Sequence, residues 1–122
     1  AGEKSFRGVG CNQCHTPTHN TGKNDFGIAE GIEVHSYTDY LLHHMDEDLA
    51  DQMVQGASTG QMWRTPPLWG LRLRKRYMHD GRTTDLDEAI TLHGGEAAKV
   101  SDAYVALPDR EKAALRSFLN SL

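Results

Sequence analysis

Two cysteines and a histidine within five residues, Cys11-Asn12-Gln13-Cys14-His15, constrain this chain more than any other feature. The pattern C-x-x-C-H is the attachment sequence of c-type haem. Thiols three positions apart lie about one helical turn apart, so both sulfurs can reach one edge of a porphyrin, and the histidine places an imidazole under the iron. The chain has only these two cysteines, so we expect one covalent haem c, held by Cys11 and Cys14 with His15 as an iron ligand.

Three other uses of the cysteine pair compete with this interpretation. A dithiol redox pair of the thioredoxin type is expected within a βαβ pattern, whereas a helix-like stretch precedes Cys11. A structural zinc site needs two more well-spaced ligands, and the seven histidines form no second paired cluster. A disulfide across two intervening residues closes too small a loop to stabilise much. Haem attachment is therefore the leading interpretation, with the redox pair as its main alternative.

Length and composition bound the class of protein. With 122 residues, of which 38% are hydrophobic and 25% charged, the chain reads as one globular domain over residues 1–122. No apolar run reaches the roughly 18 residues that a membrane span needs. There is no initiator Met and no signal-like segment, so we expect a chain that begins after a processing site or a domain cut from a longer secreted protein.

Charge gives no sign of a nucleic-acid partner. The chain carries 13 basic and 17 acidic residues, for a net charge of −4, and no polybasic run. One short basic cluster, Arg72, Arg74, Lys75 and Arg76, is interrupted by Leu73. We interpret this cluster as a solvated loop, with a docking patch or a neighbour of the haem propionates as the alternative.

Apolar periodicity predicts an all-α fold built around the haem. The first helix runs from Glu3 into the cysteine motif, and Thr84-x-x-Asp87 resembles a capping box that opens a later helix. The remaining predicted helices span residues 47–55, 65–70, 84–93, 96–106 and 108–122. No strand signal is more than weak. Residues 16–36 form a polar loop whose length requires something to order it, such as a haem edge.

The second axial ligand of the iron has several candidates. His93 shares a helix face with Leu86 and Ile90, so it points inward, and we take it as the second ligand beside His15. His79 is the runner-up, because it lies at a turn where it could ligate iron or donate to a propionate. A methionine ligand or an open site are the further alternatives, the candidate methionines being Met62 and Met78.

Propionates that are partly buried need hydrogen-bond donors, and arginine supplies a bidentate fork. Arg64, before a pair of prolines, and Arg82, after the Asp80-Gly81 turn, are the candidates. A solvated surface arginine is an equally good interpretation of each.

Three blocks of sequence, in order, carry a resemblance to a known family. They are Tyr37-Thr38-Asp39-Tyr40-Leu41-Leu42-His43, then Trp63-Arg64-Thr65-Pro66-Pro67-Leu68-Trp69-Gly70, then Tyr77-Met78-His79-Asp80-Gly81-Arg82 continuing through Leu86-Asp87-Glu88-Ala89-Ile90-Thr91-Leu92-His93-Gly94-Gly95-Glu96-Ala97. Together with the C-x-x-C-H motif, these blocks resemble the C-terminal haem domain of bacterial dihaem cytochrome c peroxidases. The chain is more similar still to the dihaem oxidoreductase, or thiol oxidoreductase-like, group.

The resemblance implies a class I-like cytochrome c fold. In the peroxidases the position matching His93 carries the distal methionine of the electron-transfer haem, whereas in the dihaem oxidoreductase group it is histidine, as here. This implies bis-His ligation by His15 and His93 and a role for His79 near a propionate. Covalent haem attachment in cytochromes takes place outside the bacterial cytoplasm, so we expect a periplasmic or extracellular protein.

The resemblance and the motif together predict electron transfer. The full enzymes have two haem domains, with peroxide chemistry at the other one, and this chain has a single haem motif. We therefore expect a redox carrier that is not itself an enzyme. Its partner would be another redox protein, such as a secreted copper or haem enzyme. Peroxidase or oxidase chemistry at an open or labile distal site is the alternative.

Overall fold

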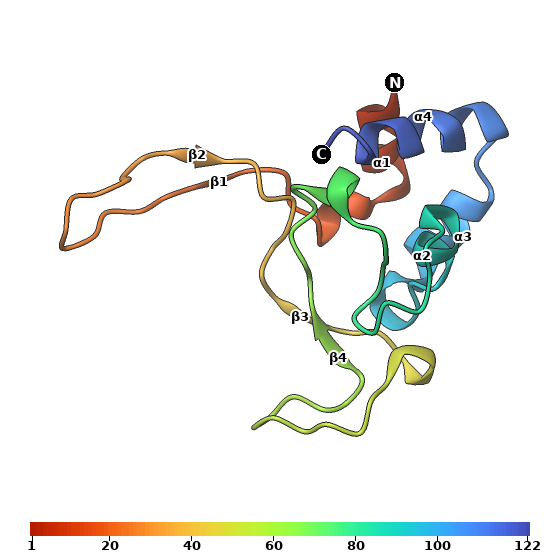
Figure 1. The fold of residues 1–122 in the computed structure, drawn as a ribbon, viewed down its shortest axis with the longest axis horizontal. Coiled ribbons are helices and arrows are strands. Elements are labelled where there is room, and N and C mark those ends of the chain that lie inside the picture. The colour runs from red at the N-terminus through yellow and green to blue at the C-terminus, as the bar shows by residue number, and fades with distance from the viewer.

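The two ends of the chain meet in a pair of packed helices. The computed structural model describes residues 1–122, and in it α1 (Gly2–Val9) lies against α4 (Asp109–Leu119), as Figure 1 shows. Gly2 permits this approach, because a Cβ at that position would clash with the carbonyl oxygen of Ala114. The apolar faces of the two helices then form most of the core, which comprises Phe6, Val9, Leu71, Tyr104, Leu115 and Leu119.

A second helical pair stands beside the first. It consists of α2 (Leu86–Thr91) and α3 (Ala98–Val105), with the 3-10 turn η4 (Gly95–Ala97) between them. The Asp87 carboxylate ties three helices together, because it accepts hydrogen bonds from the Tyr104 hydroxyl at 2.5 Å and from Arg116 Nη1 at 2.7 Å. Burial and this carboxylate together raise the pKa of Tyr104 to about 12.

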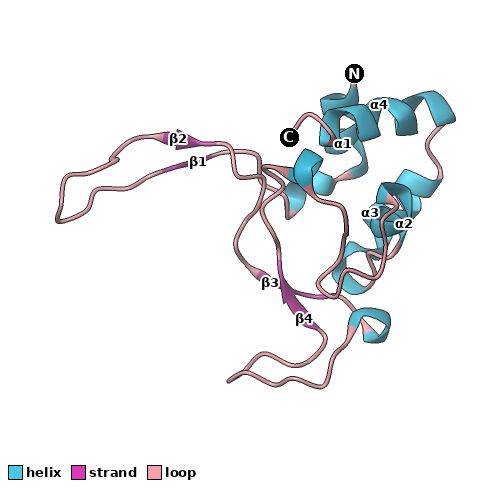
Figure 2. Cartoon of the chain, in the orientation of Figure 1, coloured by secondary structure: helices cyan, strands magenta, loops and turns pink.

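Two small antiparallel sheets make up the other side of the molecule. Strand β1 (His19–Asn20) pairs with β2 (Glu33–Val34) at the base of a long projecting hairpin, and β3 (Leu42–His44) pairs with β4 (Met62–Arg64), as Figure 2 shows. The predicted all-α fold is therefore wrong, because the fold combines short helices with two two-stranded sheets.

The pattern of apolar residues in the sequence does not predict these strands, for a physical reason. Each is only two or three residues long, too short for an apolar alternation to register. In β3 the usual pattern is also reversed, since Leu42 is exposed and the polar His43 is half-buried. Pairing between distant segments, rather than local preference, produces these strands.

Several predicted helix boundaries also need correction. The helix expected over 47–55 is reduced to the 3-10 turn η2 (Glu47–Leu49), and the one expected over 65–70 is replaced by η3 (Leu71–Leu73). The cap of α2 is Asp85, which accepts from the backbone N–H groups of Asp87 and Glu88, so the predicted capping box at Thr84 is wrong.

The first helix ends at Val9, before the cysteine motif into which we expected it to run. Gly10 ends α1 with φ of 101°, a left-handed conformation suited to glycine, and the 3-10 turn η1 (Cys11–Gln13) follows. This break turns the chain so that both cysteines and His15 face a cavity enclosed by the helices, β3–β4 and the segment that leads from β4 to α2.

Candidate functional site

A cavity of about 480 Å³ lies between the helical side and the β3–β4 side of the molecule. Its volume is within the roughly 300–1,000 Å³ of small-molecule and cofactor pockets. The lining is mainly apolar, with a few polar groups, and comes from segments far apart in the sequence. Cys11, Cys14, His15, Arg64, His79 and His93 all lie in this lining. The fold thus brings all six of the predicted site residues to one cavity.

His15 follows η1 and is held from behind by the backbone. Its Nδ1–H donates to the carbonyl oxygen of Tyr37 at 3.0 Å. Because a carbonyl can only accept, this bond places the proton on Nδ1 and leaves the Nε2 lone pair available for a ligand. Burial lowers the pKa of His15 to about 4, so the imidazole is neutral at pH 7. Tyr37 adopts φ of 53°, and this left-handed backbone aims its carbonyl at the ring.

His93 lies just past the C-terminus of α2 and has the same arrangement. Its Nδ1–H donates to the carbonyl oxygen of Ala89, one helical turn earlier, at 2.8 Å. Burial lowers the pKa of His93 below its usual value. Its Nε2 is therefore also available, on a neutral ring, for a metal ion.

The two imidazoles lie opposite each other. The ring centres of His15 and His93 are 6.5 Å apart, with their planes inclined at 57°. A metal ion bound between two imidazoles, with metal–nitrogen bonds of about 2 Å, would separate the ring centres by roughly 6 Å. The pair is therefore spaced for one metal ion with a histidine on each side.

The two cysteines border the same cavity as free thiols. Burial raises the pKa of Cys11 to about 11, and burial together with the Asp39 and Glu96 carboxylates raises the pKa of Cys14. A dithiol redox pair depends on a lowered thiol pKa. The surroundings of this pair are the opposite, so the redox-pair alternative loses support.

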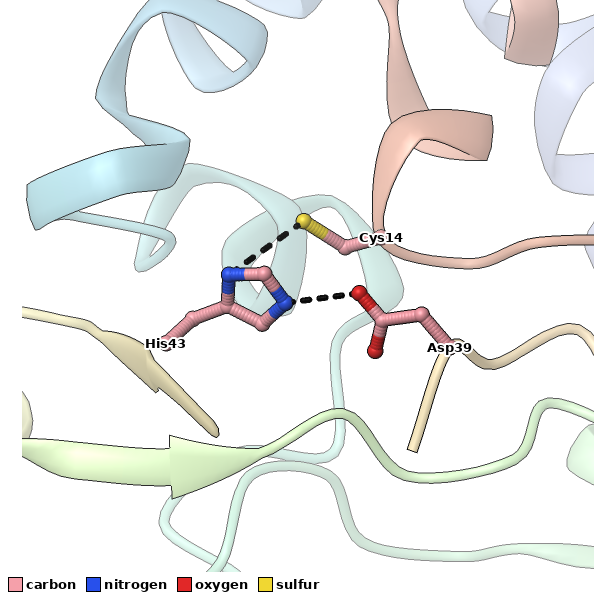
Figure 3. A group of neighbouring side chains, drawn as sticks. All are labelled: Cys14, Asp39 and His43. Carbon is pink, nitrogen blue, oxygen red and sulfur yellow. Dashed lines mark hydrogen bonds and ion pairs between the residues drawn. The ribbon is translucent and has the colours of Figure 1, made fainter. Parts of the chain in front are cut away.

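A clamp around His43 is a feature that the sequence analysis missed. The imidazole of His43 lies between two carboxylates, with Nε2 2.7 Å from Asp39 Oδ2 and Nδ1 2.8 Å from Glu96 Oε2. Figure 3 shows His43 with Asp39 and with the Cys14 sulfur, which lies 3.8 Å from His43 Nδ1. Glu96 reaches the ring because Gly95 allows η4 to approach β3, where a Cβ would clash with the carbonyl oxygen of His44.

The protonation state of His43 decides whether this clamp can bind a metal ion. Burial lowers the pKa of His43, but the bonds to Glu96 and Asp39 outweigh it and raise the pKa above its usual value. Cys14, Asp39 and His43 are close enough to share a cation. A metal ligand, however, needs a neutral imidazole, and a protonated His43 donates to both carboxylates. At pH values below 6.5, where the ring is protonated, the clamp joins β3 to η4 beside Cys14 through ion pairs.

The runner-up histidine has a different partner. The His79 ring stacks on Trp63, with ring centres 3.7 Å apart and an angle of 17° between the planes. Trp63 is fixed in turn by donating Nε1–H to the carbonyl oxygen of Leu49 at 3.0 Å. His79 thus forms part of the cavity wall together with Trp63. Arg64 is exposed at the cavity border, whereas Arg82 bonds Asp80 and does not line the cavity.

Comparison with known proteins identifies the family of the chain. The sequence profile of one family, described as "di-haem oxidoreductase, putative peroxidase", matches residues 1–122. The chain belongs to the di-haem oxidoreductase family, as the resemblance implied. Neither the curated proteins nor the solved structures contain a match to the chain. None of the helices combines the length and apolar character that crossing a bilayer requires.

The family corrects one prediction. We expected a carrier that is not an enzyme, whereas the family is described as one of oxidoreductases and peroxidases. That expectation was wrong because it rested on the presence of a single C-x-x-C-H motif. The number of such motifs indicates how many haems are attached and does not indicate whether the protein is an enzyme. Membership establishes a haem-dependent redox role.

The residues of the cavity fit a haem. Two neutral imidazoles face each other at a metal-compatible spacing, two thiols lie beside one of them, and most of the surrounding side chains are apolar. The two backbone carbonyls behind the imidazoles are the outer partners that metal-binding histidines usually have.

Proposed function

We propose that this chain is a single haem domain that holds one haem c in the cavity and transfers single electrons. Cys11 and Cys14 would hold the haem through two thioether bonds, and His15 and His93 would bind its iron. The observation that carries the proposal is the pair of opposed, neutral imidazoles 6.5 Å apart beside two thiols. A haem bound there would supply one-electron Fe(III)/Fe(II) chemistry.

The chain's own residues set the conditions for that chemistry. The carbonyls of Tyr37 and Ala89 hold both imidazoles in the tautomer that presents Nε2. The stacked rings of Trp63 and His79 form part of one wall of the cavity. Arg64, exposed at the border of the cavity, is placed to neutralise a carboxylate of the cofactor, and His79 lies at the same cavity. Two histidines favour a lower reduction potential than a histidine–methionine pair.

The electron partner is another redox centre outside the cytoplasm. The family is named for two haems, and this chain has one C-x-x-C-H motif, so the second centre belongs to another domain or another protein. A haem or copper protein of the periplasm or the extracellular space fits this role. The attachment chemistry of c-type cytochromes supports that location.

One experiment tests the proposal directly. The protein is produced in a bacterial periplasm together with a haem-attachment system, denatured in acidic acetone, and its pyridine haemochrome spectrum is recorded. We expect one haem per chain that stays with the protein, and a low-spin visible spectrum in both oxidation states without carbon monoxide binding. Haem that extracts completely, or a high-spin ferric protein that binds carbon monoxide when reduced, contradicts the proposal.

The family description favours a second function, peroxidase chemistry at a labile distal position. In this structure that function requires His93 to leave its place and break the bond to Ala89. Rapid loss of the low-spin spectrum on adding peroxide, with turnover of an electron donor, would favour this second function.

A further inference from the structure

The charges of this protein are strongly segregated. Residues 52–79 contain five basic residues and no acidic one, whereas the rest of the chain contains eight basic and 17 acidic residues. The segment therefore carries +5 in a protein whose net charge is −4. Its five basic residues are Arg64, Arg72, Arg74, Lys75 and Arg76, which we call the basic face.

The basic face borders the cavity. Arg64, at the end of β4, and Arg74, just after η3, both line it, and Arg72, Lys75 and Arg76 adjoin Arg74 in the sequence. In Figure 1 this part of the chain rises from β4 to the green turn η3 and descends again towards α2. Two of the five positive charges therefore lie where the cavity meets the surface, and the other three lie close to Arg74 in the chain.

These charges are free to act on a partner. All five side chains are exposed, and none lies within 4.0 Å of a carboxylate oxygen, whereas other arginines of the chain, such as Arg7 and Arg82, are in ion pairs. Arg74 and Arg76 donate only to backbone carbonyls, those of Pro67 and Gly81.

Apolar surface lies among the charges. Trp69 is 52% exposed and Leu73, between Arg72 and Arg74, is 77% exposed. Aromatic and arginine side chains are enriched at protein interfaces, where an apolar centre is surrounded by a polar rim. A loop that served only to carry charge into water would not need Trp69 and Leu73 at its surface.

We propose that the basic face is the docking surface for the acidic surface of a one-electron redox protein or domain. This proposal rests on the proposed function, because it places the site of electron exchange at the cavity border. Complementary charge steers and orients the encounter, and Trp69 and Leu73 provide the apolar contact. One electron crosses the interface, so that the donor is oxidised and the acceptor reduced, and no bond forms or breaks.

The proposal is tested by whether added salt raises or lowers the rate constant of electron transfer to a small anion. The reduced, haem-loaded protein is mixed with ferricyanide, a trianion that takes one electron and becomes ferrocyanide. A protein of net charge −4 repels a trianion, so salt would speed the reaction if net charge governed it. Local charge governs at close range once the Debye length is about 10 Å or less. We expect the rate constant to fall several-fold between about 0.1 M and 0.5 M salt.

Two charge-reversed double variants distinguish the effect of where the basic residues lie from the effect of the net charge of the protein. Arg72→Glu with Lys75→Glu alters the basic face at residues that do not line the cavity. Lys4→Glu with Arg110→Glu is the matched control, at a separate hollow bordered by α1 and α4, and both double variants have net charge −8. We expect the first variant to react more rapidly as salt is added and the control to keep the wild-type slowing.

A redox-inert probe locates the surface without electron transfer. Hexacyanochromate(III), a paramagnetic trianion, broadens the NMR signals of residues near which it binds. We expect broadening at residues 64 and 72–76 in the wild-type protein and its loss in the Arg72→Glu, Lys75→Glu variant. Wild-type spectra that broaden elsewhere, a wild-type rate that rises with salt, or equal behaviour of the two double variants would overturn the proposal.

These outcomes are distinguishable from failure of the proposed function. A protein that carries no covalent haem, or that is high-spin and binds carbon monoxide, contradicts the proposed function by its spectrum alone. A low-spin protein that exchanges electrons rapidly but without the expected salt dependence contradicts only the docking surface.

Discussion

His15 and His93 face each other across the cavity, and each donates Nδ1–H to a backbone carbonyl, that of Tyr37 and that of Ala89. Both rings therefore keep the Nε2 lone pair available for a ligand. Replacing His93 by alanine removes one of these nitrogens. We expect His93→Ala to convert the haem-loaded protein from low spin to high spin and to let the reduced form bind carbon monoxide, as measured by visible and electron paramagnetic resonance spectra.

His79 provides the matched control for that variant. Because its ring stacks on Trp63, we expect His79→Ala to stay low-spin. A low-spin His93→Ala protein, or a high-spin His79→Ala protein, would show that the distal ligand is assigned to the wrong histidine.

Exchanging the ligand at the same position tests its effect on the potential. A thioether raises the reduction potential of haem iron relative to an imidazole. We expect His93→Met to raise the potential by on the order of 100 mV, a fraction of the roughly 0.8 V that axial ligands span. Redox titration followed by absorbance measures the shift. An unchanged or lowered potential would argue against His93 as a ligand.

The clamp around His43 predicts a pH dependence of stability. The pKa of His43 is raised above its usual 6.5, so its contribution is complete below pH 6.5 and is lost as pH rises through the folded value. The pKa values of Asp39 and Glu96 are lowered, so their contributions are lost as pH falls below about 4. We expect His43→Asn to destabilise the protein by about 1 kcal/mol near pH 5.5 and by less at pH 9.

Urea unfolding at several pH values measures this difference. His44→Asn is the control, because the exposed His44 ring has no hydrogen-bond partner and only its backbone N–H reaches Glu96. A cost of His43→Asn that is the same at pH 5.5 and pH 9 would mean that the imidazole is not protonated in the clamp.

The Asp87 carboxylate predicts a structural effect away from the cavity. Tyr104, only 2% exposed, donates its hydroxyl to Asp87, which also binds Arg116. We expect Tyr104→Phe to lower the free energy of unfolding by about 1–2 kcal/mol, because a hydrogen bond to a charged group is lost. Tyr40→Phe, at a residue 46% exposed, should cost much less. Equal costs for the two variants in urea unfolding would contradict this role of Asp87.

The helical half of the molecule and the cavity residues could be predicted from the sequence because their signals are local. C-x-x-C-H is one pentapeptide, and the inward direction of His93 followed from its spacing to Leu86 and Ile90 along one helix. The first signal covers about one helical turn and the second about two. The structure places all these residues at one cavity.

The sheets and the His43 clamp depend on contacts that no local pattern contains. Leu42 pairs with Arg64, and His43 meets Glu96, in each case across more than twenty residues. The three-residue strands are too short to show an alternation of apolar and polar residues. In the sequence, His43 also cannot be distinguished from its exposed neighbour His44. Only the folded chain reveals that His43 and not His44 faces inward.

The cavity takes the place that apolar side chains fill in most domains of this size, since only eight hydrophobic residues are buried. Its two opposed histidines come from distant parts of the chain, with the cysteines beside the first. Cys11 and Cys14 lie near the start of the chain, and His93 lies in its last third. The proposed attachment can therefore take place on a chain that has left the cytoplasm and has not yet folded, and packing of His93 then closes the interior over a cofactor that is already bound. On this view haem attachment comes before folding.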